Sequence, residues 1–163
     1  MNIIRQVASS MVKFKYMKRI IIYFCIGFGI SLAETVYHIP IEGTIDLGLP
    51  PFIERSIAEA EENNARTIIF EVNTFGGRVD AATQIKDAIL DSKVPTVAFI
   101  NKRAISAGAL ISLSCEKVFM AGGATIGATT AVDMQGNKAS EKVISYMREE
   151  MAATAEKRGR DTY

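Results

Sequence analysis

The sequence has very few of the side chains that usually bind metals or form disulfide frameworks. Its only histidine is His38, and its two cysteines, Cys25 and Cys115, show no spacing typical of a zinc site. Cys25 falls in a segment that reads as an export leader, so no disulfide framework is indicated. A formal net charge of +1 gives no reason to expect a nucleic-acid partner. These absences leave local motifs as the source of functional information.

Residues 1–33 are typical of a signal peptide. Basic residues precede an apolar run, Ile20 to Leu32, which is short for a permanent membrane helix. Ser31 and Ala33 then supply the small side chains that a signal peptidase requires before Glu34. We expect export, with an uncleaved N-terminal membrane anchor as the alternative, and a location outside the cytoplasm.

Residues 34–163 are long enough for one domain, and 48% hydrophobic with 23% charged residues is a globular composition. Hydrophobic periodicity predicts strands and helices in alternation, which favours an α/β fold with a mainly parallel sheet. Strands are expected over 36–42, 66–72, 94–100 and 117–121, and helices over 50–63, 79–90, 106–114 and 140–157. The chain ends at "GRDTY" without a closing strand, which indicates a domain that is incomplete at its C-terminus.

Two glycines, Gly76 and Gly77, stand where the strand ending in "FEVNTFGG" meets the next helix. Exposed backbone amides beside a helix N-terminus can bind a developing negative charge, as in an oxyanion hole. A plain strand-to-helix turn explains the same glycines, and the motif gains weight only from its neighbours.

Ser106, in "NKRAISAGALIS", occupies the equivalent position in the next strand–helix unit. If the two units lie side by side, the amides of Gly77 and Ala107 face one point beside the Ser106 hydroxyl. That constellation suits acyl transfer, although Ser106 also fits as a small residue where a helix packs on a sheet.

A serine nucleophile needs a base, and His38 is expected to be a partly buried strand residue instead. A lysine can serve where burial lowers its pKa. The candidates that follow the serine are Lys117, Lys138, Lys142 and Lys157. Lys142 is favoured because it opens the last helix, where a cation opposes the helix dipole, although a solvated lysine is the common alternative.

Four motifs, "NTFGGRVDAA", "AISAGALIS", "GATIGATTAV" and "EKVISYMREEMAATAEKRGRD", resemble in order and spacing the N-terminal protease domain of the NfeD family. These membrane-bound serine proteases are related in fold to ClpP and the crotonases. The resemblance spans about residues 35–163 and implies a ClpP/crotonase-like fold of repeated β-β-α units.

The resemblance implies a Ser–Lys dyad of Ser106 and Lys142, with Gly77 and Ala107 as the oxyanion hole and no metal or cofactor. Substrate-binding roles are implied for Phe75, Gly76 and Gly127, with residues 123–132 as a loop that shapes the substrate groove. Many relatives have proline where this chain has Phe75.

The implied activity is endopeptidase cleavage of apolar segments in peptides or membrane proteins, with a stomatin-like partner or substrate and a homodimeric protease domain. Long family members continue into membrane helices and a small β-barrel. The alternative is a non-catalytic interaction domain that docks on a stomatin-like membrane protein. A crotonase-type acyl-CoA enzyme is disfavoured, because an exported domain would not meet coenzyme A.

Overall fold

The computed structural model describes residues 34–127 and 139–161. The leader predicted over residues 1–33 and the second half of the loop predicted at 123–132 lie outside these residues, and the signal peptide stays a prediction. None of the described helices has the length and apolarity needed to cross a membrane.

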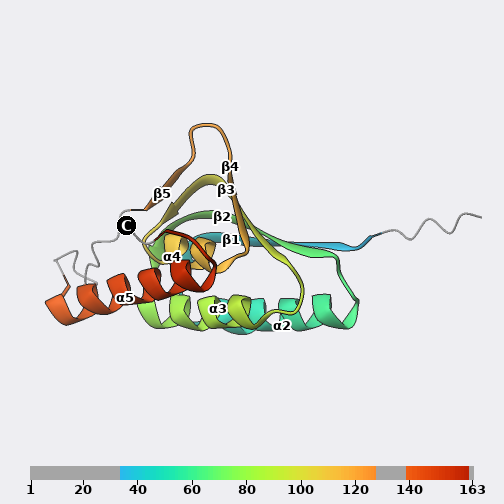
Figure 1. Ribbon diagram of the computed structural model, residues 1–163, viewed down its shortest axis with the longest axis horizontal. Coiled ribbons are helices and arrows are strands. Elements are labelled where there is room, and N and C mark those ends of the chain that lie inside the picture. The colour runs from blue at the N-terminus through green and yellow to red at the C-terminus, as the bar shows by residue number, and fades with distance from the viewer. Residues whose placement is uncertain (1–33, 128–138, 162–163) are drawn as a thin grey trace, which may run out of the picture. The chain divides into compact units, whose positions relative to one another are not determined.

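Strands and helices alternate along the chain, as the hydrophobic periodicity predicts (Figure 1). In chain order the elements are β1 (Val36–Ile45), α2 (Leu49–Glu62), β2 (Thr67–Gly77), α3 (Val79–Asp91), β3 (Thr96–Ile105), α4 (Ala107–Ser114), β4 (Lys117–Met120), β5 (Thr125–Gly127) and α5 (Glu141–Lys157).

The described sheet is parallel throughout, with β1, β2, β3 and β4 adjacent in that order and β5 paired with the end of β3. Figure 1 shows α2, α3, α4 and α5 on one side of β1, β2 and β3. Because successive strand residues point to opposite faces, every second residue of β2, from Ile68 to Thr74, is buried toward these helices. The other face of the sheet, which we call the helix-free face, carries partly exposed side chains.

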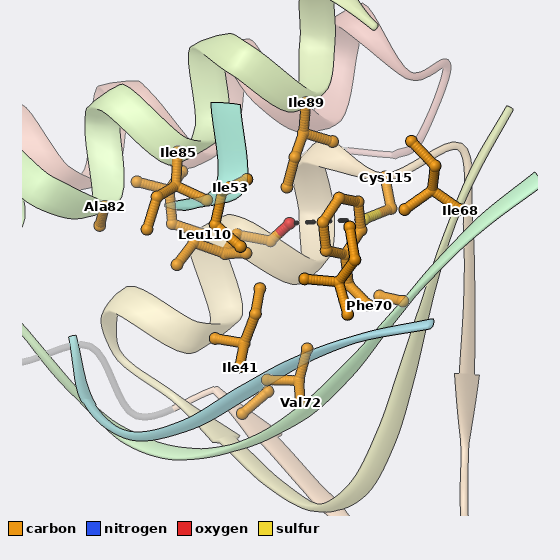
Figure 2. Close-up of a cluster of buried hydrophobic side chains, with 14 of the residues drawn as sticks. Ile41, Ile53, Ile68, Phe70, Val72, Ala82, Ile85, Ile89, Leu110 and Cys115 are labelled. Carbon is orange, nitrogen blue, oxygen red and sulfur yellow. Dashed lines mark hydrogen bonds between the residues drawn. The ribbon is translucent and has the colours of Figure 1, made fainter. Parts of the chain in front are cut away.

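The core fills the space between the sheet and the helices, and Figure 2 shows its central side chains. Ile41, Phe70 and Val72 from the strands meet Ile53 of α2 and Ile85 of α3, all fully buried. Full burial of one such side chain stabilises the fold by about 1.5–3 kcal/mol. The short helix α4 contacts β2, β3, α3 and α5, and seven of its residues are buried.

Three strands run farther than predicted, and one was missed. β1 continues to Ile45. β2 continues through the glycines to Gly77, and β3 continues to Ile105, where the sequence suggested a break. The predicted loop at 123–132 contains the short strand β5, which pairs with Arg103, Ala104 and Ile105. Three residues are too few for a periodic pattern, so this strand forms only through its contact with β3.

The last helix ends as predicted: α5 stops before Gly159, whose φ of 66° is the left-handed conformation common after a helix C-terminus. Two arginines beyond the helix bind carbonyl groups at the end of α4. Arg158 Nε donates to Ser114 O (2.6 Å), while Arg160 donates to Leu113 O (2.6 Å) and Cys115 O (2.7 Å). These bonds satisfy carbonyls that α4 leaves unpaired and tie the C-terminal ends of α4 and α5 together.

Candidate active site

The glycine turn and the serine lie side by side, as the sequence predicts. β2 and β3 are parallel neighbours, and Thr74 is opposite Ala104 just before both strands end. A Cβ at Gly76 would lie 2.8 Å from Ile105 O, 3.0 Å from Ser106 Cβ and 3.2 Å from the Ala107 nitrogen. With φ at 105°, position 76 needs glycine both for its backbone conformation and for this close approach.

Gly77 is the last residue of β2 and packs closely on the edge strand β1. Gly77 is opposite Ile45 of β1, and the following N–H, that of Arg78, donates to Ile45 O (2.8 Å). A side chain at position 77 would collide with the Ile45 backbone, which explains the second glycine.

Ser106 has a strained backbone, with φ 54° and ψ −112°. Among the described residues only Asn64 and Ser106 have positive φ without being glycine. Such a conformation costs about 1–3 kcal/mol, and persists where the surroundings fix it, often at active sites. The Ser106 N–H donates to Gly127 O (2.9 Å), and its carbonyl accepts from Ala109 (2.9 Å) at the start of α4.

The Ala107 amide lies at the N-terminus of α4, one residue after Ser106. Ala107 is 1% exposed, and its nitrogen lies next to Gly76. The first N–H groups of a helix have no partner within the helix, and the helix dipole makes this end positive. The Ala107 amide therefore lies where the positive end of α4 meets the glycine turn, next to the serine.

Thr74 supports this turn and was not among the residues predicted for the site. Its side chain is 1% exposed, donates to Gly43 O (2.5 Å) and accepts from the Gly76 N–H (2.9 Å). A Cβ at Gly108 would come within 2.5 Å of Thr74 Cγ2, so α4 packs closely on this threonine. The one feature of the sequence that could have indicated this role is the place of Thr74, a polar residue at the end of an apolar strand and two positions before Gly76.

Phe75 and Gly127, predicted to bind substrate, flank the serine. Phe75 is 73% exposed on the helix-free face, and the guanidinium of Arg103 lies over its ring, 4.4 Å from the centroid. Gly127, with φ at 126°, presents its carbonyl to the Ser106 N–H.

Lys142 is exposed in the first turn of α5 and lines a groove between α3 and α5 with a volume of about 900 Å³. The other lining residues are Arg78, Val79, Asp80, Thr83, Gln84, Val143 and Tyr146. Arg78 and Val79 directly follow Gly77, so the groove begins next to the glycine turn. Ser106 is not part of the lining, and within the described residues neither the Ser106 hydroxyl nor the Lys142 ammonium forms a hydrogen bond. The burial that a lysine base requires is absent from this arrangement.

Ion pairs on α3 define the charge around the groove. Arg78 contacts Asp80 through two hydrogen bonds (3.0 and 2.7 Å), which hold the pKa of the Asp80 carboxyl below its ordinary value. Farther along, Lys86 Nζ binds Asp87 Oδ1 and Glu150 Oε2, both at 2.8 Å, and thereby joins α3 to α5. Burial lowers the pKa of Lys86, but the hydrogen bonds to these two carboxylates outweigh it and leave a raised pKa.

His38 differs from its prediction as a partly buried residue. Its side chain is 57% exposed on the helix-free face, and Nε2 lies 2.8 Å from Glu71 Oε2. Glu71 Oε1 accepts a second hydrogen bond from Asn101 (2.7 Å). Because β1 is an edge strand and no described helix covers this face, alternation in β1 exposes the imidazole.

The described residues have a ClpP-like fold. ClpP1 from Listeria monocytogenes aligns with 77% of this chain and 74% of its own, at a TM-score of 0.61 and 24% identity, which supports the fold alone. The chain belongs to the NfeD family, because residues 35–163 match the N-terminal domain of NfeD1b.

Two relatives share this domain. Membrane protein NfeD1b of Bacillus subtilis is 43% identical over 128 residues, which are 78% of this chain and 29% of the relative. Membrane-bound protease PH1510 of Pyrococcus horikoshii is 33% identical over 134 residues, which are 77% of this chain and 30% of the relative. The chain thus spans less than a third of the length of these two relatives.

Solved structures of the 1510-N membrane-bound stomatin-specific protease agree with the fold. A serine-to-alanine variant has a TM-score of 0.73 and 32% identity, with 80% of this chain and 68% of that chain aligned. A lysine-to-alanine variant in complex with a substrate peptide has a TM-score of 0.74 and 31% identity, with 80% and 64% aligned.

Proposed function

We propose that this protein is a serine endopeptidase with Ser106 as nucleophile and Lys142 as general base. The observation that carries the proposal is the strained backbone of Ser106, held beside Gly76 at the N-terminus of α4. Strain of this kind exposes a nucleophile at a sharp turn between a strand and a helix. The relatives add support, since PH1510 is a protease and 1510-N was solved with a serine and a lysine replaced.

In the proposed reaction, neutral Lys142 takes the proton of the Ser106 hydroxyl while the oxygen attacks a peptide carbonyl. The amides of Gly77 and Ala107 stabilise the negative oxygen of the tetrahedral intermediate. The C–N bond then breaks, Lys142 gives its proton to the departing amine, and an acyl-enzyme remains on Ser106. Water repeats the sequence, releases the acid and restores the serine.

Lys142 must approach the serine when substrate binds. It lines a groove that starts next to the glycine turn, so a bound peptide covering this groove would also exclude water from the lysine. Val79, Val143 and Tyr146 give the groove apolar surface, which suits substrates with apolar segments. We therefore extend the proposal to membrane-associated proteins, such as a stomatin-like partner, acted on by a homodimer outside the cytoplasm.

One observation favours a second candidate function. Lys142 is exposed and shares no hydrogen bond with Ser106 in the described residues, as expected for a domain that only docks on a membrane protein. In that case the groove between α3 and α5 would bind a partner without cleaving it.

A fluorophosphonate probe and an apolar fluorogenic peptide separate the two functions. The endopeptidase is expected to label at Ser106 and to lose at least about 100-fold in cleavage rate in Ser106→Ala and in Lys142→Ala. Ser145→Ala and Lys157→Ala alter exposed positions of the same types on α5 and should retain activity. Labelling that persists in Ser106→Ala would reject the nucleophile, and full activity in Lys142→Ala would reject the base.

A further inference from the structure

The pair of Phe75 and Arg103 lies on the helix-free face, two residues before the ends of β2 and β3 that meet at Ser106. Phe75 is 73% exposed and directly precedes Gly76, which contacts Ser106. Arg103 is partly buried, and its guanidinium lies over the phenyl ring at 4.4 Å from the centroid. A cation over an aromatic face is attracted by the ring quadrupole, so Phe75 holds the guanidinium in place.

The charge of Arg103 has no counter-ion in the part of the chain that the structure describes. None of the carboxylates of residues 34–127 and 139–161 reaches ion-pair distance from it. Glu71, an acidic residue on the same face, already binds His38 (2.8 Å) and Asn101 (2.7 Å). An oriented, partly buried and unpaired guanidinium therefore stands next to the candidate active site.

From this geometry we infer that Arg103 is a specificity-determining residue, which binds the carboxylate of an aspartate or glutamate in the peptide held at Ser106. The inference rests on the proposed peptidase function and names a feature of its substrate. A guanidinium presents N–H donors in a planar fork that fits a carboxylate. Arg103 already occupies one face of the Phe75 ring, so that face is closed to a substrate side chain.

The expected preference is moderate, since the site is partly exposed and screened by salt. Pairs of an apolar peptide are prepared, in which one position near the cleaved bond carries glutamate in one member and glutamine in the other. Each pair tests a different position. We expect kcat/KM to favour glutamate by about 3- to 10-fold at one position, and less at high salt.

Charge reversal provides the matched comparison. In Arg103→Glu the preference at that position should invert. The peptide with glutamate should be cleaved more slowly than the peptide with glutamine, and a third peptide with lysine there should be cleaved faster than the glutamine peptide. Lys102→Glu makes the same change of charge at the adjacent exposed residue and should retain the preference for glutamate. Phe75→Leu removes the ring that orients Arg103 and should reduce the preference without inverting it.

Peptide affinity, measured with the uncleaving variant Ser106→Ala, separates this inference from the proposed function. A glutamate preference in binding supports the Arg103 site even if wild type cleaves no peptide, which would reject only the peptidase. Equal kcat/KM for all pairs in an active wild type overturns the Arg103 site and leaves the peptidase in place. Equal changes of the glutamate preference in Arg103→Glu and Lys102→Glu also overturn it. They would show that the preference follows the net charge of this surface and not a contact with Arg103.

Discussion

The two halves of the candidate site are fixed to different degrees. At the serine half, Gly76, Ser106 and Ala107 are held by strand pairing, by Thr74 and by backbone atoms within about van der Waals distance. At the lysine half, the first turn of α5 is exposed, and Met147 is the first buried residue of that helix. α5 is attached mainly through its second half, by the Lys86–Glu150 pair and by the arginines after its end.

The two halves therefore differ in how rigidly the surrounding structure holds them. The serine half is preorganised, because its geometry does not change without breaking the sheet or moving α4. The lysine half borders an open groove, and its first turn contributes no buried residue to the core. Substitutions should therefore affect the serine half through the fold and the lysine half through the chemistry alone.

The largest effect is expected for Gly76→Ala. The added methyl group would lie 2.8 Å from Ile105 O at a φ of 105°, so β2 and the Ser106 turn would have to separate. We expect a loss of about 2–4 kcal/mol in unfolding free energy and of at least 100-fold in peptide cleavage, measured by urea unfolding and by kcat/KM.

Gly122→Ala is the matched control, because a Cβ there meets open space and the backbone needs no positive φ. It should change both quantities little. If Gly76→Ala kept wild-type stability, the serine half would be less rigid than its contacts imply.

A smaller effect, on stability alone, is expected for Arg160→Ala. The change removes the hydrogen bonds to Leu113 O and Cys115 O at the end of α4, at about 1–3 kcal/mol in unfolding free energy. Hydrogen exchange should rise first in α5 and the end of α4, and Arg148→Ala, an exposed position on α5, should stay within about 0.5 kcal/mol of wild type. Equal loss of protection throughout β2 would contradict an attachment confined to the helices.

The effect that is smallest at neutral pH concerns Cys115, which is fully buried at the C-terminal end of α4. Burial raises the pKa of its thiol to about 12, from an ordinary value near 9. Below pH 9 the thiol is neutral in both states, whereas between pH 9 and 12 it ionises mainly in the unfolded chain. Unfolding free energy should therefore fall as the pH rises over that range, because the unfolded chain releases the proton that the folded thiol keeps.

Cys115→Ala should show a flatter dependence on pH than wild type over the same range, whatever its stability at neutral pH. The folded thiol should also resist iodoacetamide at pH 8, with mass spectrometry locating the label. Parallel pH curves for the two proteins, or rapid alkylation of folded Cys115, would contradict its burial.

Sequence reasoning predicted what depends on parallel strands and missed what depends on tertiary contact. The sequence put the glycine turn and Ser106 at equivalent strand–helix junctions, and in the structure Gly76 lies next to Ser106 because β2 and β3 are parallel neighbours. The roles predicted for the Gly77 and Ala107 amides stay predictions. The strain at Ser106 and the strand β5 arise from pairing with distant residues, which no local pattern encodes. The position of Lys142 depends on how α5 docks, and the sequence left its burial open.

The eight-residue length of α4 has one more consequence. A helix this short does not persist in water by itself, so its first turn exists only while β2, β3, α3 and α5 enclose it. The strained backbone conformation of Ser106 is then a cooperative property of the folded domain and not of its local sequence. Partial unfolding that releases α4 would relax this conformation while much of the sheet remains, so the proposed peptidase would lose its activity before the domain unfolds completely.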